Sequence, residues 1–321
     1  MDKTGNTFNS AAYGGPGWQG RTRTHREEIG DLWTASGIDS EYATLRSVLL
    51  HRPGGELAAA LEDPNSVQML EALDLGRAGE QHDAMAEAYR TNGVDVQYVD
   101  PAGQPTPNQM FCADLFVMSP EGAILARPAS TVRAGEERWI ARRLADAGVP
   151  ILRTLTGTAV FEGADLMWLD PETVMVGLGL RTNEDAAAQI ASSMEEIGVE
   201  TLAVDMPFGT MHFMGMLRIV DKDLAICWPR RTPFSAVRAL EERGYEILWL
   251  PDGESDGTLN RALNIVTLGP RKVLMLAGYD AVQKVYEKAG IECVTVDGSE
   301  LVKAAGAIGC LTGVVRRDLV G

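Results

Sequence analysis

Several classes of protein are excluded by what this chain of 321 residues has little of. It has only four cysteines, and none of them forms a CxxC pair or a cysteine–histidine cluster with the spacing of a zinc site. So few cysteines argue against a disulfide scaffold and favour reduced thiols in a cytoplasmic protein. No apolar run reaches the roughly 18 residues that a membrane span needs, and the polar, glycine-rich residues 1–20 do not resemble a signal peptide.

Basic residues are also scarce relative to acidic ones. Lysine and arginine number 29 against 45 aspartates and glutamates, so the net charge is −16. Binding to nucleic acid without sequence preference needs a basic face, so neither a nucleic-acid partner nor a membrane partner is expected. The sequence contains no GxxxxGK[ST] loop and no GxGxxG fingerprint, and we expect no cofactor and no metal. The acidic balance is compatible with a cationic small-molecule substrate.

What the chain has in quantity is apolar sequence arranged in repeated units. The hydrophobic fraction of 45% is enough for a sizeable core. Strand, helix and strand patterns follow one another with a faint period of roughly 50–60 residues, which is typical of a pseudo-symmetric array. The predicted strands and helices include 47–51, 66–92 and 94–99, then 114–118, 123–127, 135–147 and 150–154, then 173–177, 184–197 and 201–204, and finally 272–276, 280–289 and 293–296.

No linker divides this repeated region. Residues 1–40 are predicted to form a partly irregular arm, because the sequence Gly-Gly-Pro-Gly at 14–17 interrupts regular structure and a small basic cluster follows at 21–26. Residues 41–321 are predicted to form a single catalytic domain. The role of the arm and association into a homo-oligomer are left open.

Cys310 is the cysteine whose surroundings favour reactivity. It lies in the segment 306–313 (Gly-Ala-Ile-Gly-Cys-Leu-Thr-Gly), which we predict to be a loop whose glycines let a ligand approach the sulfur. Cys227 and Cys293 lie in strand-like runs and are predicted to be small buried apolar residues. A reactive thiol has to ionise, and nearby positive charge or a helix N-terminus favours the thiolate.

One histidine and three carboxylates are further candidates for chemistry. An imidazole such as that of His212 can give a proton to a leaving amine and then activate water. Asp114, Glu162 and Asp165 each come where a strand-like segment meets a loop. A buried carboxylate needs a partner, and a planar cation with several N–H donors is a suitable one. Each residue also has an ordinary interpretation, as a structural histidine or a surface carboxylate.

Taken in order along the chain, these motifs resemble those of the guanidino-modifying enzymes: arginine deiminases, dimethylarginine hydrolases, arginine dihydrolases and amidinotransferases. Each motif alone is weak, whereas their shared order is specific. The matching segments are residues 46–54, 111–114 (Phe-Cys-Ala-Asp), 161–165 (Phe-Glu-Gly-Ala-Asp), 177–183, 211–212 (Met-His), 261–265 and 309–310 (Gly-Cys).

The resemblance implies a fold and a set of roles. The fold is the pentein, an α/β propeller of five ββαβ-type units around a pseudo-fivefold axis, with the site in the central channel. Cys310 attacks the guanidinium carbon, Asp114 and Glu162 bind the guanidinium N–H groups, and His212 protonates the departing amine and then deprotonates water. The residues implied to bind substrate are Asp165, Arg181, Phe111 and Asn264, with Arg181 pairing with an amino-acid carboxylate.

Two positions depart from the family pattern. Met214 stands where deiminases and amidinotransferases have the aspartate of a His-x-Asp motif, and this leaves room for an N-substituted guanidine. Ala113 stands where deiminases have an arginine, which is closer to the arginine dihydrolases, although Asp114 replaces their asparagine.

The chain is therefore predicted to be a C–N hydrolase acting on the guanidino group of arginine or an arginine-like compound, through a covalent thiouronium intermediate on Cys310. The alternative is an amidinotransferase that passes the amidino group to an amine acceptor. A non-catalytic pentein that binds a ligand or partner is the third interpretation.

Overall fold

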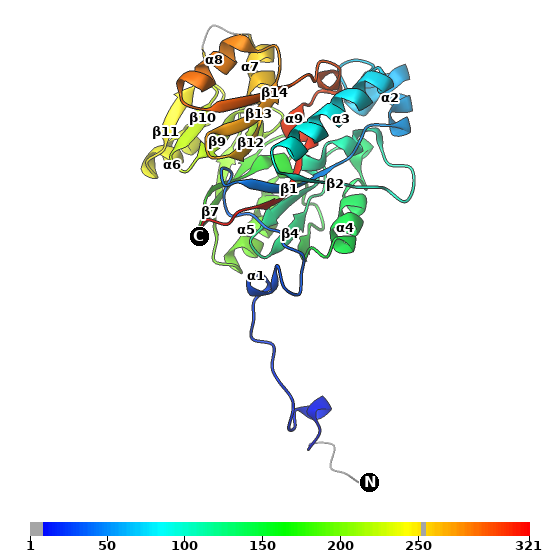
Figure 1. The fold of residues 1–321 in the computed structure, drawn as a ribbon, viewed down its shortest axis with the longest axis vertical. Helices are drawn as coiled ribbons and strands as arrows, with labels where there is room; N and C mark the ends of the chain where they lie inside the picture. Colours follow the sequence, from blue (N-terminus) through cyan, green and yellow to red (C-terminus); the bar gives the residue numbers. More distant parts are fainter. Residues whose placement is uncertain (1–8, 252–254) are drawn as a thin grey trace.

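The computed structural model describes residues 9–251 and 255–321. Within them the strands form five sheets of three strands each, arranged around a common centre (Figure 1). Their orders are β15-β1-β2, β3-β4-β5, β6-β7-β8, β11-β10-β9 and β12-β13-β14. The strands are β1 (Leu45–Leu50), β2 (Asp95–Tyr98), β3 (Phe116–Ser119), β4 (Gly122–Leu125), β5 (Ile151–Thr154), β6 (Leu166–Asp170), β7 (Thr173–Leu178), β8 (Glu200–Asp205), β9 (Leu217–Asp221), β10 (Leu224–Cys227), β11 (Glu246–Trp249), β12 (Val266–Gly269), β13 (Lys272–Leu276), β14 (Glu292–Val296) and β15 (Gly313–Arg317).

Each sheet has the same internal pattern. Its middle strand pairs antiparallel with one neighbour and parallel with the other, as β7 does with β6 and β8. A parallel pair needs a crossover, and a helix supplies it in every unit. The crossover helices are α3 (Leu75–Thr91), α4 (Glu137–Asp146), α5 (Glu184–Glu195), α6 (Phe234–Glu242) and α8 (Asp280–Lys288). This repeated unit confirms the predicted α/β propeller of five ββαβ-type units.

The three strands of a sheet differ in burial from one side to the other. The antiparallel partner is buried along its length, as in β3 and β6, whereas the parallel partner is half-buried or exposed, as in β5 and β11. The antiparallel partners therefore lie innermost, and the segments that precede them reach the centre of the molecule.

The ring is closed by pairing between the two ends of the domain. Strand β15 pairs antiparallel with β1, so that Val314 lies opposite Val48 and Gly313 opposite Leu49. The end of the chain thus completes the first unit, and Cys310, which directly precedes β15, is brought to the same inner position as the residues that precede β3, β6, β9 and β12.

The structure corrects two sequence-based predictions of local structure. The helix predicted over 66–92 begins only at Leu75, because the Asp74 side chain accepts a hydrogen bond from the Arg77 backbone and caps the helix there. Cys310 lies in a single helical turn, α9 (Ile308–Leu311), and not in a loop.

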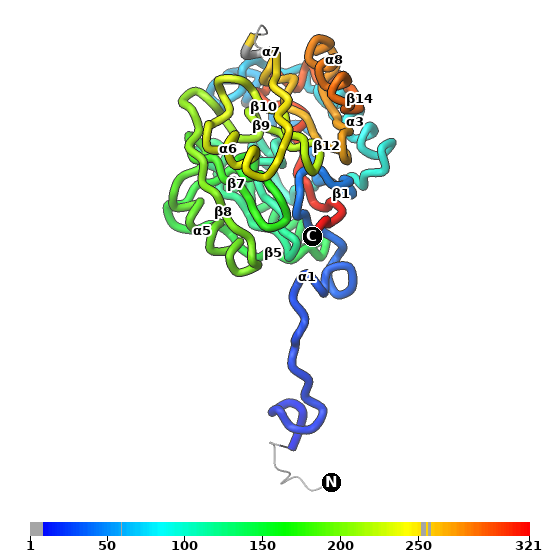
Figure 2. The backbone as a smooth tube through the Cα atoms, turned by 90° about the vertical axis from the view of Figure 1, so that its left-hand side faces the viewer, coloured from blue at the N-terminus to red at the C-terminus, as the bar shows by residue number. Residues whose placement is uncertain are grey.

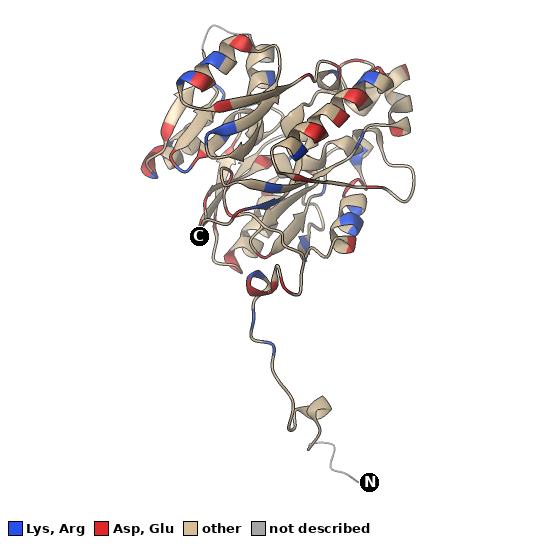
Figure 3. Cartoon of the chain, viewed as in Figure 1, with Lys and Arg blue, Asp and Glu red and all other residues tan. Residues whose placement is uncertain are grey.

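The N-terminal arm lies partly outside the propeller. Residues 9–24 extend away from the propeller, past the short helix α1 (His25–Glu28) (Figure 2). Residues nearer the propeller join it, since Gly37 bonds with Val315 and Arg317 and Asp39 accepts hydrogen bonds from Val320 and Gly321. Acidic and basic residues are interspersed along the outer helices (Figure 3). No helix among the described residues is long and apolar enough to cross a membrane.

Candidate active site

Five units each deliver a polar residue to the centre, from the segment just before the innermost strand. Asp114 lies in the 3₁₀ turn Cys112–Asp114 before β3, and Glu162 precedes the turn Gly163–Asp165 before β6. His212 precedes the turn Phe213–Gly215 before β9. Asn264 ends helix α7 (Asp256–Leu263) before β12, and Cys310 lies in α9 before β15. The common position in the repeat explains why residues so far apart in sequence meet.

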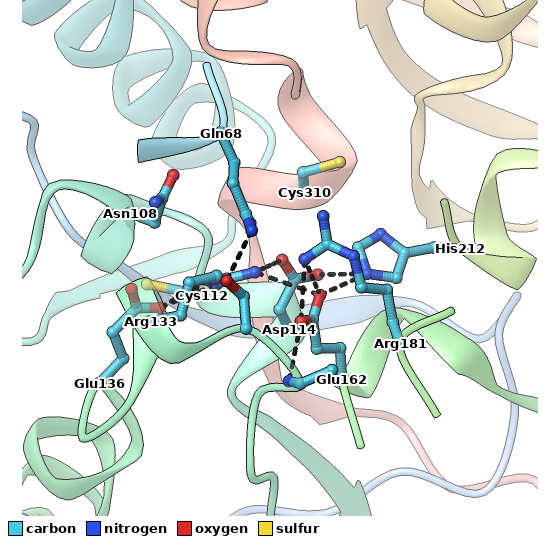
Figure 4. Close-up of polar contacts among 12 residues, drawn as sticks. Gln68, Asn108, Cys112, Asp114, Arg133, Glu136, Glu162, Arg181, His212 and Cys310 are labelled. Atoms are coloured by element: carbon cyan, nitrogen blue, oxygen red, sulfur yellow. Dashed lines mark hydrogen bonds and ion pairs between the residues drawn. The ribbon is translucent and has the colours of Figure 1, made fainter. Parts of the chain in front are cut away.

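Carboxylates, arginines and the histidine form one buried cluster on one side of the site (Figure 4). The Arg133 Nη1 atom donates to Asp114 Oδ2 at 2.7 Å and to Glu162 Oε2 at 3.2 Å. Arg181 Nη1 donates to Glu162 Oε1 at 3.0 Å, and His212 Nε2 lies 2.6 Å from Glu162 Oε2. Glu162 is fully buried. A buried carboxylate is retained only when it is paired in this way.

The cluster sets the charge states of His212 and Glu162. Burial lowers the pKa of His212, but the carboxylates of Asp114, Glu162 and Asp165 outweigh it and raise that pKa to about 9. Burial acts to raise the pKa of Glu162, but the His212 hydrogen bond and the charge of Arg133 bring it down to about 2. At neutral pH the site therefore holds an imidazolium beside a carboxylate.

Asp165 lies behind this cluster and does not contribute to the pocket wall. Its Oδ2 accepts from the Thr182 hydroxyl at 2.6 Å, and its Oδ1 accepts from the backbone N–H of Phe213 at 2.9 Å. Burial raises the pKa of its carboxyl to about 7. Asp165 thus fixes the backbone next to His212, and its part in substrate binding stays a prediction.

The nucleophile candidate is held by an asparagine. Asn264 Nδ2 donates to Cys310 Sγ at 3.1 Å, while Asn264 Oδ1 accepts from the backbone N–H groups of Gly309 at 2.7 Å and Cys310 at 3.4 Å. Gly309 has no room for a side chain, because a Cβ there would lie 2.4 Å from Arg218 Nη2. Burial and the charge of Asp114 raise the pKa of the Cys310 thiol. These surroundings favour the neutral thiol over the thiolate.

The other cysteines are in apolar surroundings. Cys227 is fully buried in β10 and Cys112 is fully buried beside Asp114, and burial raises the pKa of both thiols, that of Cys227 to about 12. Cys293 lies in β14, where burial raises its thiol pKa to about 11. The predicted buried, apolar role of Cys227 agrees with its surroundings, and Cys293 is partly buried. Of the four, Cys310 is the one that lines the pocket.

A pocket with about 310 Å³ of empty space joins Asp114 and His212 to the thiol of Cys310. Five of the eight residues predicted from sequence line it, namely Phe111, Asp114, Arg181, His212 and Cys310, whereas Glu162, Asp165 and Asn264 do not. Among the polar residues of the wall, Gln68, Asn108 and Arg133 were not singled out in the sequence.

Arg133 is the most informative of the residues that sequence reasoning missed. It is the last residue of the short 3₁₀ turn Thr131–Arg133, and the stretch 130–133 (Ser-Thr-Val-Arg) contains no motif. Its importance comes from its burial and from its contacts with Asp114, Glu162 and Glu136, which are 19, 29 and 3 residues away along the chain. A buried arginine needs carboxylate partners, but nothing local in the sequence shows that Arg133 is buried.

Asp114, Glu162 and His212 also have the donor types of a metal site, with one ligand atom of each within 4.8 Å of the others. The carboxylates, however, are already engaged by the guanidinium groups of Arg133 and Arg181. Planar, hydrogen-bonding cations therefore already occupy this corner, and they are partners that such a pair of carboxylates suits.

Comparison with known proteins identifies the family. A family model described as N,N dimethylarginine dimethylhydrolase, eukaryotic, matches residues 65–317. The chain belongs to this family. An N(G),N(G)-dimethylarginine dimethylaminohydrolase of Streptomyces coelicolor is 27% identical over 267 residues, covering 83% of this chain and 96% of the relative. An uncharacterized protein, YkgA, of Bacillus subtilis is 25% identical over 281 residues, covering 85% of this chain and 92% of the relative.

Solved structures agree on the fold. A mutant of the dimethylarginine dimethylaminohydrolase from Pseudomonas aeruginosa, complexed with citrulline, superimposes with a TM-score of 0.71 at 22% identity, covering 85% of this chain and all of that chain. An amidinotransferase from Microseira wollei in the saxitoxin biosynthetic pathway superimposes with a TM-score of 0.72 at 15% identity, covering 88% of this chain and 97% of that chain. Members of the dimethylarginine dimethylhydrolase family and their structural neighbours are guanidino-modifying penteins, and so is this chain.

Proposed function

We propose that this enzyme hydrolyses a C–N bond in the guanidino group of arginine or of an N-methylated arginine, with Cys310 as the nucleophile. The observation that carries the proposal is that Cys310, His212 and Asp114 line one pocket, and that Glu162, buried behind its wall, contacts His212 and Arg133, in a chain of the dimethylarginine dimethylhydrolase family. Relatives of this family are named for the release of dimethylamine from dimethylarginine.

Substrate binding begins with an exchange of cations. The substrate guanidinium takes the corner formed by Asp114 and Glu162, where Arg133 Nη1 now bonds both carboxylates. Arg133 gives up at least one of these bonds as the substrate arrives. Arg181 lines the same pocket, and we expect it to pair with a substrate carboxylate.

The arriving cation also activates the nucleophile. The Cys310 thiol has a raised pKa in the free site, and a guanidinium beside the sulfur favours the thiolate, whose proton leaves to solvent. The thiolate forms an S–C bond to the guanidinium carbon and gives a neutral tetrahedral adduct. The C–N bond to the departing nitrogen then breaks as His212 gives that nitrogen its proton, leaving a neutral amine and a cationic thiouronium on Cys310.

Water completes the reaction. The imidazole of His212, now neutral, takes a proton from water as the oxygen bonds to the thiouronium carbon. The S–C bond then breaks, the hydroxyl proton leaves with the sulfur, and a urea product is released, which is citrulline when the substrate is an arginine. Carboxylates suit the site because the reacting carbon carries positive charge before and after the first step.

The test is mass spectrometry of the purified enzyme with arginine, N-methylarginine and N,N-dimethylarginine, each with and without glycine as an amine acceptor. Citrulline and free amine formed without glycine are expected, together with a covalent amidino adduct on Cys310 at short times. Cys310→Ser is expected to abolish both, while Cys293→Ser, a change at a cysteine outside the pocket, retains them. Product formed only when glycine is present would establish amidino transfer instead, and absence of turnover throughout the series would overturn the proposal.

A further inference from the structure

A second cavity meets the first one at the nucleophile. It holds about 910 Å³ of space, counted out to its open mouth, against about 310 Å³ for the first. The walls of both include Met211, His212, Ala305 and Cys310. The thiol and the imidazole therefore stand between two spaces, and a substrate held at Cys310 has room on either side of its guanidinium carbon.

The two cavities differ in charge. The first contains Asp114, Arg133 and Arg181, which suit the guanidinium and the carboxylate of an amino acid. No described residue lining the second is an aspartate or a glutamate. With Arg231 in its wall and no carboxylate, the second cavity disfavours a protonated amine acceptor and leaves room for a neutral group.

Part of the wall of the second cavity is apolar, alongside the polar side chains of Thr210, Arg231, Asn260 and Asn264. Met214 and Met216 come from the segment that carries His212, and Trp228 follows strand β10 across from them. Met216 and Trp228 are buried. Methionine is unbranched and polarisable, and adapts to alkyl groups of different shapes. Met214 occupies the third position of the histidine motif, where deiminases and amidinotransferases resembling this chain have an aspartate.

We propose that the second cavity binds an alkyl substituent larger than methyl on the departing nitrogen of the substrate, so that the substrate class is N-alkylated arginines and the amine released is a longer alkylamine. This inference rests on the proposed function. A substrate whose carboxylate pairs with Arg181 in the first cavity points its departing nitrogen past Cys310, toward the second. The alkyl substituent binds as part of the guanidino group, and it is released as part of the neutral amine once His212 has delivered its proton.

The experiment compares arginines that carry methyl, ethyl, propyl or butyl on one terminal nitrogen. Affinities for Cys310→Ser are measured by calorimetry, and kcat/KM for the wild-type enzyme by citrulline formation. Each buried methylene is expected to tighten binding by about twofold to fourfold. The propyl compound is expected to be cleaved with a kcat/KM at least equal to that of the methyl compound.

A variant that fills the second cavity, paired with a control variant outside it, tests the same inference. Met214→Trp is expected to lower the ratio of kcat/KM for the propyl compound to that for the methyl compound by at least about tenfold, because the added ring occupies the space of the alkyl chain. Phe234→Trp introduces the same ring at an exposed position of α6 outside both cavities, and the ratio is expected to stay unchanged.

Two outcomes separate this inference from the proposed function. If the methyl compound is cleaved but binding and kcat/KM fall steadily from methyl to propyl, the alkyl site is refuted and the hydrolase stands. If no arginine in the series is cleaved, the proposed function fails and the inference fails with it. Should Met214→Trp not fold, the wild-type series alone still decides between the alternatives.

Discussion

The two sides of the site differ in the charge that their residues carry. On the carboxylate side, Asp114 pairs with Arg133, and Glu162 pairs with Arg181 and His212. On the nucleophile side, Cys310 is neutral and is held by the amide of Asn264 and by the backbone. In the proposed mechanism, the charges on the carboxylate side are in place before the substrate cation binds, whereas the nucleophile becomes charged only once that cation is present. The arrangement keeps the thiol inert in the empty enzyme.

The largest effect on stability and activity is expected from Glu162→Gln on the carboxylate side, because it removes the charge that Arg133, Arg181 and His212 share. The substitution leaves buried cations without a partner, and breaking a buried ion pair costs about 3–5 kcal/mol of stability. With the substrate guanidinium also losing a carboxylate, kcat/KM is expected to fall roughly 100-fold to 1000-fold. Urea unfolding and steady-state kinetics measure the two effects.

Asp165→Asn is the matched control, because Asp165 is equally buried but lies behind the site, bonded to Thr182 and Phe213. Its effect on kcat/KM is expected to be clearly smaller than that of Glu162→Gln. Equal losses for the two variants would mean that the carboxylate contacting the cations has no special role.

A smaller effect is expected on the nucleophile side, from Asn264→Ala. The variant removes the N–H that donates to Cys310 Sγ and the oxygen that holds the Gly309 and Cys310 backbone. A hydrogen bond to the sulfur favours the thiolate, so its loss raises the thiol pKa and slows alkylation of Cys310 by iodoacetamide at neutral pH, by about tenfold per pKa unit.

Asn92→Ala is a control of the same chemical change, since the Asn92 amide donates to the Ala88 carbonyl at the end of α3. It is expected to leave the alkylation rate unaltered. An unchanged rate in Asn264→Ala as well would show that the amide only shapes the turn and does not affect the sulfur.

The sequence was sufficient for the parts of the site that recur at a fixed place in the repeat. Asp114, Glu162, His212, Asn264 and Cys310 each precede an innermost strand, and their order along the chain was recognisable as a family pattern. The alternation of strands and helices likewise predicted the propeller, because the buried strands are apolar runs and the crossover helices are amphipathic.

What the sequence did not reveal depends on long-range burial. From the sequence alone, Arg133 would be taken for a surface residue. In the structure its buried side chain contacts Asp114 and Glu162. Asp165 sits in a motif with Glu162 but turns to Thr182 and Phe213, a difference of direction that spacing alone does not contain. In the second cavity Met214 and Trp228, from the unit of β9 and β10, meet Asn264 and Cys310 from two other units, so only the folded chain shows that these residues line one space.

The smallest expected effect is on the pH dependence of stability, and its sign follows from the His212 cluster. The pKa of His212 is raised from 6.5 to about 9, so its charged contacts stabilise the fold fully below pH 6.5 and are lost as pH rises toward 9. The pKa of Glu162 is lowered from 4.5 to about 2, so its contribution is present above pH 4.5 and is lost as pH falls toward 2. Both contributions are therefore complete between pH 4.5 and pH 6.5.

Urea unfolding of the wild type and of His212→Gln at pH 6, 8 and 10 tests the upper limit. The wild type is expected to lose more free energy of unfolding than the variant between pH 6 and 10, because only the wild type has the imidazolium to deprotonate. Parallel losses in the two proteins would show that His212 is not held protonated by the carboxylates. In that case the carboxylate side would resemble the nucleophile side, with a neutral base that acquires its charge only when the substrate binds.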